Sequence, residues 1–139
     1  MNLAVGAIAF LWLGMVLALS FLEAPLKFRA PGITVPLGLG IGRLVFRALN
    51  IVEVVLLLGV GIALLAGPRS TPILWATAAV ALLLVVQLAA VRPALAARTR
   101  RVLAGDPHTG SRAHLAYIAL ELVKVGGLVV LGLAASAVI

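Results

Sequence analysis

Four long runs of apolar residues, separated by shorter polar connections, dominate the pattern of this chain. A membrane-crossing helix needs about 20 largely apolar residues, in a range of roughly 17 to 25. The runs of this length are Leu3–Leu22, Ala48–Ala66, Ile73–Val91 and His114–Val138. They predict helices over approximately residues 3–22, 44–66, 73–91 and 113–138, within a single membrane domain covering residues 1–139. The expected fold class is therefore all-α: a polytopic membrane protein built as an antiparallel bundle of four transmembrane helices.

The connections predict where these helices begin and end. Three prolines between Ser20 and Pro36 are expected to end the first helix, because proline removes a backbone donor and restricts the residue before it. The glycines at 38, 40 and 42 are typical of a flexible hinge, so the second helix is expected to start near Arg43. No Lys or Arg precedes Glu23, which favours a retained first helix over a cleaved signal peptide.

Composition supports a lipid environment, since 64% of the residues are hydrophobic and only 11% are charged. The absence of cysteine excludes disulfides, thiolate metal sites and thiol catalysis. The formal net charge of +7 arises mostly beside the predicted helices, which favours anionic lipid headgroups over nucleic acid as partners. The residues expected to contact headgroups in the third connection are Arg98, Arg100 and Arg101.

The distribution of positive charge also predicts the topology. The first and third connections carry nearly all the Lys and Arg, while the second has only Arg69. Retained positive charge marks the cytoplasmic side. We therefore expect a multi-pass protein of the cell's inner (plasma) membrane, with both termini outside the cytoplasm.

Polar residues recur at helical spacing on two of the predicted helices. Arg43, Arg47 and Asn50 lie four and three residues apart, and Glu53 follows three residues later. The fourth helix has a second stripe, formed by His114, Tyr117, Glu121 and Lys124. Gln87 lies near the same membrane face at the end of the third helix.

Ionisable groups that face lipid cost roughly 2.5 to 3.5 kcal/mol on insertion scales, so they usually turn inward and pair. We therefore expect one shared cluster near the cytoplasmic face. Its candidate binding residues are Arg43, Arg47, Asn50, Glu53, Gln87, Arg92, His114, Tyr117, Glu121 and Lys124.

Two interpretations of this cluster remain open. In the structural one, Glu53 pairs with Arg47 or Lys124, and Glu121 pairs with Lys124 or Arg92, which holds the helices in register. In the functional one, a pocket open to the cytoplasmic leaflet binds a cation or proton through the carboxylates and an anionic group through the arginines. A metal site is not favoured, because neither histidine has a ligand-like partner four residues away. No nucleophile with a base and an orienting group is visible.

Two family resemblances accompany these patterns. Trp12–Gly14, the A-P-L-K-F-R-A-P segment from Ala24 and the G-R-L-V-F-R entry to the second helix resemble uncharacterised bacterial membrane proteins of the transmembrane-205 and copper-resistance D types. This resemblance covers about the first half of the chain and implies a four-helix fold with a link to metal or drug tolerance. The histidine ligands that a copper role would need are missing.

The segment R-L-V-F-R-A-L-N-I-V-E is similar to the signature of the MAPEG superfamily, four-helix membrane enzymes that hold glutathione between the subunits of a trimer. Arg43, Asn50 and Glu53 keep the relative spacing of that signature, while its middle Arg-Ala pair is shifted by one, to Arg47 and Ala48. The resemblance implies that Arg43, Asn50 and Glu53 bind the glutathione peptide. The third-helix tyrosines of that superfamily are absent.

The leading functional hypothesis is a small non-enzymatic membrane protein without a cofactor, a transporter-like or accessory subunit that binds a small ion or amphiphile. A MAPEG-like glutathione-dependent enzyme or lipid-handling protein is one alternative, and a structural subunit of a larger membrane complex is another. Four short helices enclose little interior, so a homo-oligomer or membership of a membrane complex is expected.

Overall fold

The computed structural model describes residues 1–91, 93, 97, 100, 104 and 112–136. Every regular element in these ranges is helical, and four helices are long and apolar enough to cross a membrane. The first joins α1 (Leu3–Val16), the π-helical η1 (Leu17–Glu23), α2 (Ala24–Leu26) and the 3₁₀-helical η2 (Lys27–Arg29). The others are α3 (Val35–Ala66), α4 (Thr71–Val86) with the π-helical η3 (Gln87–Val91), and α6 (Arg112–Ala135).

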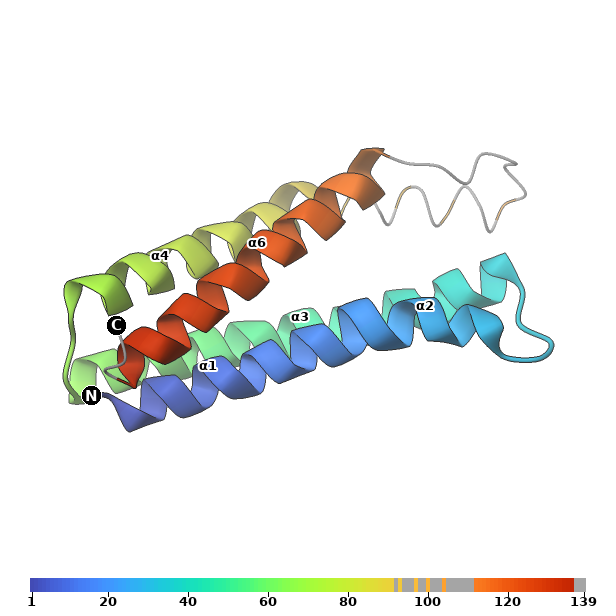
Figure 1. Ribbon diagram of the computed structural model, residues 1–139. Coiled ribbons are helices and arrows are strands. Elements are labelled where there is room, and N and C mark those ends of the chain that lie inside the picture. Colours follow the sequence, from blue (N-terminus) through green and yellow to red (C-terminus); the bar gives the residue numbers. More distant parts are fainter. Residues whose placement is uncertain (92, 94–96, 98–99, 101–103, 105–111, 137–139) are drawn as a thin grey trace.

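The helices lie side by side along one long axis (Figure 1). The N-terminus, the end of α6 and the α3–α4 connection lie at one end of the molecule, called here the terminal end. The turn at residues 30–34, which joins the first helix to α3, lies at the opposite end, called here the loop end. Helix α6 packs against both α1 and α4, and α3 packs chiefly against α1.

The expected start of the second helix near Arg43 is wrong, because α3 begins eight residues earlier at Val35. The Thr34 side chain caps this start by accepting a hydrogen bond from the backbone N–H of Leu37, and a proline occupies the first turn. The glycines at 38, 40 and 42 are therefore part of a continuous helix and not a hinge. A Cβ atom at Gly38 would lie 2.2 Å from the Phe28 ring, so this glycine permits close contact with the first helix.

The first helix also continues further than expected, through Pro25 to Arg29. The π-helical turn that precedes Pro25 pairs the N–H of Ala24 with the carbonyl of Leu19, five residues back. A π turn widens the helix, so we attribute to it the accommodation of a proline ring that would clash in an α-helix. The chain leaves the helix at Ala30, whose extended backbone is followed by Gly32 in the left-handed region with φ +79°.

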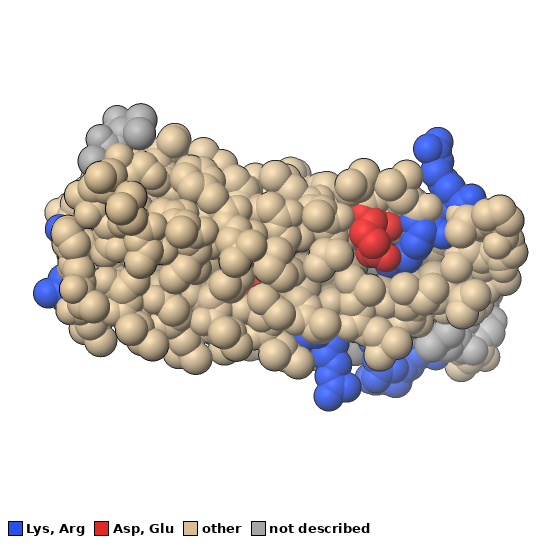
Figure 2. Space-filling model, turned by 90° about the horizontal axis from the view of Figure 1, so that it is seen from below, with Lys and Arg blue, Asp and Glu red and all other residues tan. Residues whose placement is uncertain are grey.

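The core between the helices is apolar toward the terminal end. The buried side chains that pack together there are Val5, Ala9, Val60, Leu64, Ile73, Ala76, Leu131, Ala134 and Ala135. Asn2 closes this end, since its side-chain amide donates to the carbonyls of Ala63 and Pro68 at 3.1 and 2.9 Å. The outer surface is also largely apolar, and on the face in Figure 2 most of the basic side chains gather toward the loop end.

Candidate functional site

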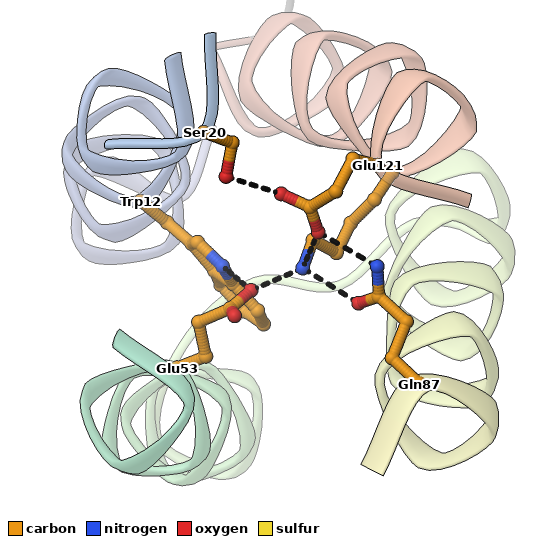
Figure 3. Close-up of polar contacts among 6 residues, drawn as sticks. Trp12, Ser20, Glu53, Gln87 and Glu121 are labelled. Atoms are coloured by element: carbon orange, nitrogen blue, oxygen red, sulfur yellow. Dashed lines mark hydrogen bonds and ion pairs between the residues drawn. The ribbon is translucent and has the colours of Figure 1, made fainter. Parts of the chain in front are cut away.

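Six polar side chains meet in the interior between the helices, and we call them the Lys124 cluster. Figure 3 shows that its labelled members, which come from the first helix, α3, η3 and α6, point toward one another. Five of the six, among them both carboxylates, are at most 1% exposed. The members are Trp12, Ser20, Glu53, Gln87, Glu121 and Lys124.

The Lys124 ammonium group is the centre of this cluster. Its Nζ atom lies 2.5 Å from Glu53 Oε2 and 2.5 Å from Glu121 Oε1. It also donates to Gln87 Oε1 at 2.8 Å. An ammonium group has three donors and no acceptor, so these three contacts use its full hydrogen-bonding capacity. Lys124 therefore ties α3 and the third helix to its own helix, α6.

The Glu121 carboxylate is fully coordinated by its neighbours. Its Oε1 atom accepts from Gln87 Nε2 at 2.7 Å in addition to the ion pair with Lys124. Its Oε2 atom accepts from the Ser20 hydroxyl at 2.8 Å. Both oxygens of a buried carboxylate are thus satisfied, which is the arrangement that buried charge requires.

The Glu53 carboxylate is coordinated on one side only. Its Oε2 atom accepts from the Trp12 indole N–H at 2.8 Å and from Lys124. Its Oε1 atom is buried and accepts no hydrogen bond from any described residue. The same is true of Asn50 Oδ1, three residues earlier on the same helix. Two buried acceptor oxygens thus remain without a donor beside the otherwise saturated cluster.

The charges of the cluster do not balance. Two carboxylates face one ammonium group, so with all three ionised the described cluster carries one net negative charge. Buried charge without a counter-charge is strongly unfavourable in a low-dielectric interior. The oxygen available to take a compensating positive charge is Glu53 Oε1, because Glu121 has no free acceptor oxygen.

The cluster lies well inside the apolar length of the helices. Glu53 is six residues beyond Arg47, or about 9 Å at 1.5 Å per residue, and it is thirteen residues, or about 20 Å, from the end of α3 at Ala66. Gln87 and Ser20 both lie in π-helical segments, each followed by a proline within a few residues. Such segments are frequent at functional sites because they redirect a side chain within a helix.

The structure brings together four of the residues expected from the sequence, namely Glu53, Gln87, Glu121 and Lys124. Both carboxylates pair with Lys124, one of the partners predicted for each. Asn50 and Tyr117 are buried one turn closer to the loop end, where Tyr117 packs edge-to-face against Phe46 at 5.7 Å between ring centroids.

The two described arginines that were expected in the cluster do not join it. Arg43 and Arg47 are exposed on the outside of α3. Arg92, Arg98 and Arg101 lie outside the described residues, as does the side chain of His114, while Arg100 is exposed. The MAPEG-like expectation places Arg43 with Asn50 and Glu53 in one glutathione site; in this chain Arg43 is exposed and the other two are buried.

Two members of the cluster, Trp12 and Ser20, were not among the residues selected from the sequence. The sequence did contain a pattern that could have identified them. Residues 5, 9, 12, 16 and 20 recur at intervals of three or four, which places Trp12 and Ser20 on the buried face of the first helix. An indole N–H and a hydroxyl on one buried helix face both need acceptors in a lipid environment. Tryptophan and serine also serve in simple helix packing, so the spacing alone did not separate these roles.

The donor set does not favour a multidentate metal site. Within the described ranges, no group of three or more His, Cys, Asp or Glu side chains is placed to hold a metal ion. Comparisons with models of protein families, with curated proteins and with solved structures find no match to this chain. We therefore infer the function from the geometry of the Lys124 cluster.

Proposed function

We propose that this chain is an integral membrane protein in which an antiparallel bundle of four helices binds one proton at Glu53 and couples that proton to the movement of a solute. The observation that carries this proposal is the charge imbalance of the Lys124 cluster together with the donor-free oxygen of Glu53. In this proposal the protein is a small proton-coupled transporter or a subunit of one.

Membrane insertion is supported by the surface of the molecule. Large apolar side chains are exposed along the helices, including Leu58 at 63%, Leu65 at 80% and Leu82 at 65%. A soluble protein rarely exposes such a continuous apolar surface, whereas lipid is a suitable solvent for it. The loop end carries Lys27 and Arg29, so in our proposal it faces the cytoplasm and the termini lie on the opposite side.

A proton is the positive charge that fits this site best. A metal ion or sodium needs several oxygen ligands and space for its coordination shell, while a proton needs one lone pair. Protonation of Glu53 at Oε1 would leave Glu121 and Lys124 as a neutral pair, and it would place an O–H donor on an oxygen that lacks a hydrogen bond. The buried cluster would then carry no net charge.

Protonation also offers a route to conformational change. Because α3 packs chiefly against α1, the Glu53–Lys124 ion pair is a direct polar link from α3 to α6. A neutral carboxylic acid binds an ammonium group more weakly than a carboxylate does. Loading the proton should therefore weaken the link between α3 and α6, and losing it should restore the link. This is the kind of two-state contact that coupling requires.

Spin-label distances can test this coupling directly, because the chain contains no cysteine. Leu58 on α3 and Val130 on α6 are both exposed, so Leu58→Cys and Val130→Cys can carry one label each. In proteoliposomes, acidification should shift or broaden the distance between the labels. The same pair in a Glu53→Gln background should give one distance at every pH, because the amide cannot take up the proton.

The matched control is Arg69→Gln, an exposed charge at the terminal end, which should respond to acid as the parent protein does. A pH response of equal size in the Glu53→Gln protein would refute the proposed coupling. So would an unchanged distance in the parent protein over the pH range in which its carboxyl groups titrate.

A further inference from the structure

The interior on the two sides of the Lys124 cluster differs in polarity. From the cluster to the terminal end, the buried side chains are apolar over the last eleven residues of α6 after Lys124, about 16 Å at 1.5 Å per residue. From the cluster toward the loop end, the first helix presents Ser20, Glu23 and Lys27 at intervals of three and four residues. Charged side chains therefore continue from the cluster toward the loop end, while the buried Thr77 hydroxyl is a polar group on α4 toward the terminal end.

The contacts along the first helix connect this series to the cluster. The Ser20 hydroxyl donates to Glu121 Oε2 at 2.8 Å. Glu23, within one turn of Ser20, forms an ion pair with Lys27 at 3.8 Å. The side chains of Lys27 and Glu23 are 11% and 30% exposed, so this pair lies at the boundary between interior and surroundings. Glu23 Oε2 itself is buried and accepts no hydrogen bond from the described residues.

A second observation points in the same direction. Asn50 is 5% exposed, and its Oδ1 atom also lacks a donor among the described residues. It lies on α3 one turn from Glu53, on the side of the loop end. The buried acceptors at Glu23, Asn50 and Glu53 that lack a hydrogen-bond donor among the described residues lie between the cluster and the loop end or within the cluster, whereas the buried Thr77 Oγ1, which also lacks one, lies on α4 toward the terminal end. Such atoms normally mark positions where water or another donor enters.

We propose that Ser20 and Glu23 form a one-sided proton path that joins the Lys124 cluster to the loop end and leaves the terminal end sealed. This inference rests on the proposed proton site at Glu53 and adds the direction from which that site is reached. The titratable and charged groups that face the path are Glu23 and Lys27 on the first helix, Glu53 on α3, and Tyr117, Glu121 and Lys124 on α6. Gln87 is the polar group from the third helix.

The proton transfers along this path balance without any further reactant. Glu23 takes a proton from the surroundings and passes it to the Ser20 oxygen, directly or through a water molecule. Ser20 releases its own hydroxyl proton to the Glu121 carboxylate, to which it already donates. Rotation of the protonated Glu121 carboxyl group turns its O–H from the Ser20 side to the Lys124 side, and it passes that proton to Lys124 as the ammonium group gives one to Glu53 Oε2. Rotation of the neutral Glu53 carboxyl group then exchanges its two oxygens, so Lys124 stays charged and the proton ends at the donor-free position.

Accessibility of single cysteines tests the direction of the path. Ser20→Cys and Ser136→Cys are near-isosteric replacements near the cluster and at the terminal end, and Ala9→Cys lies in the apolar half. A membrane-impermeant thiol reagent should label Ser20→Cys only from the side of the loop end, Ser136→Cys only from the other side, and Ala9→Cys from neither. Labelling is compared in right-side-out and inverted membrane vesicles.

Three outcomes would overturn the one-sided path. One is labelling of Ser20→Cys from the same side as Ser136→Cys. Another is the absence of Ser20→Cys labelling from both sides while Ser136→Cys reacts. The third is labelling of Ala9→Cys in a folded protein.

The Ser20 hydroxyl can be tested independently by kinetics. After a pH jump, Ser20→Ala should protonate Glu53 about a hundredfold more slowly than the parent protein, the lower range for a positioned proton-transfer group. Ser20→Thr, which keeps a hydroxyl, should restore the rate. An unchanged rate in Ser20→Ala would refute the path and leave the Glu53 site intact, whereas a Glu53 that never protonates would refute the site itself.

Discussion

Replacing Lys124 with methionine should destabilise the protein strongly, because it removes the only described cation between two buried carboxylates. Lys124 makes three short contacts through its charged ammonium group, two with carboxylates and one with the Gln87 amide oxygen. A hydrogen bond to a charged group contributes about 1.5 to 3 kcal/mol, so the direct sum is about 4.5 to 9 kcal/mol. Protonation of the abandoned carboxylates relieves part of this loss, and removal of one partner from a buried pair typically costs about 3 to 5 kcal/mol. We expect Lys124→Met to lie in that lower range.

The assay is reversible unfolding in mixed micelles with increasing denaturing detergent, followed by circular dichroism. Lys27→Met is the matched control, since its partner Glu23 is 3.8 Å away and both side chains are partly exposed. A pair of this kind contributes about 0 to 1 kcal/mol. The double variant Glu53→Gln/Lys124→Met should recover part of the loss. A Lys124→Met protein within about 1 kcal/mol of the parent, or a Lys27→Met protein destabilised as much as Lys124→Met, would refute the reasoning.

Three further predictions follow from other contacts. Trp12→Phe removes the indole donor to Glu53 and should cost about 1.5 to 3 kcal/mol in the same unfolding assay, whereas Trp75→Phe, at a side chain that is 74% exposed, should have little effect; equal losses would contradict the role of Trp12. Asn2→Ala removes the N-cap of α1 and two side-chain hydrogen bonds to the α3–α4 region, so the free energy of unfolding should fall by about 1 to 2 kcal/mol. An unchanged free energy of unfolding would show that these bonds do not stabilise the terminal end. Millimolar glutathione should leave the melting temperature of the purified protein unchanged, because Glu53 is occupied by Trp12 and Lys124; a glutathione-dependent rise together with a trimer would support the MAPEG-like alternative instead.

The four long helices could be predicted from sequence because the length of an apolar run is a physical requirement of the bilayer. The boundaries were less well predicted. Thr34 followed by Pro36 is a helix-start signal, but the alternating glycines after it suggested a hinge. In the structure these glycines are helical, and Gly38 serves close packing instead of a hinge, because its missing side chain leaves space for the Phe28 ring. Pro25 did not end the first helix, since a π turn precedes it, and sequence patterns do not register a change from an α to a π turn.

The centre of the site could also be predicted in part. Glu121 and Lys124 share one face of their helix, and Glu53 must turn inward at its depth, so their convergence follows from spacing and the cost of facing lipid. The outward placement of Arg43 and Arg47 did not follow, because it depends on the rotation of α3 about its own axis. That rotation is fixed by packing against α1, which also brings Trp12 to Glu53.

The most direct test of the central claim is infrared spectroscopy of the carboxyl groups during a pH titration of the purified protein in lipid. We predict a carbonyl band from one buried protonated carboxylic acid that is lost in Glu53→Gln and unaffected in Glu23→Gln. Persistence of this band in the Glu53→Gln protein, or its absence from the parent protein at every pH at which the protein is folded, would contradict the account.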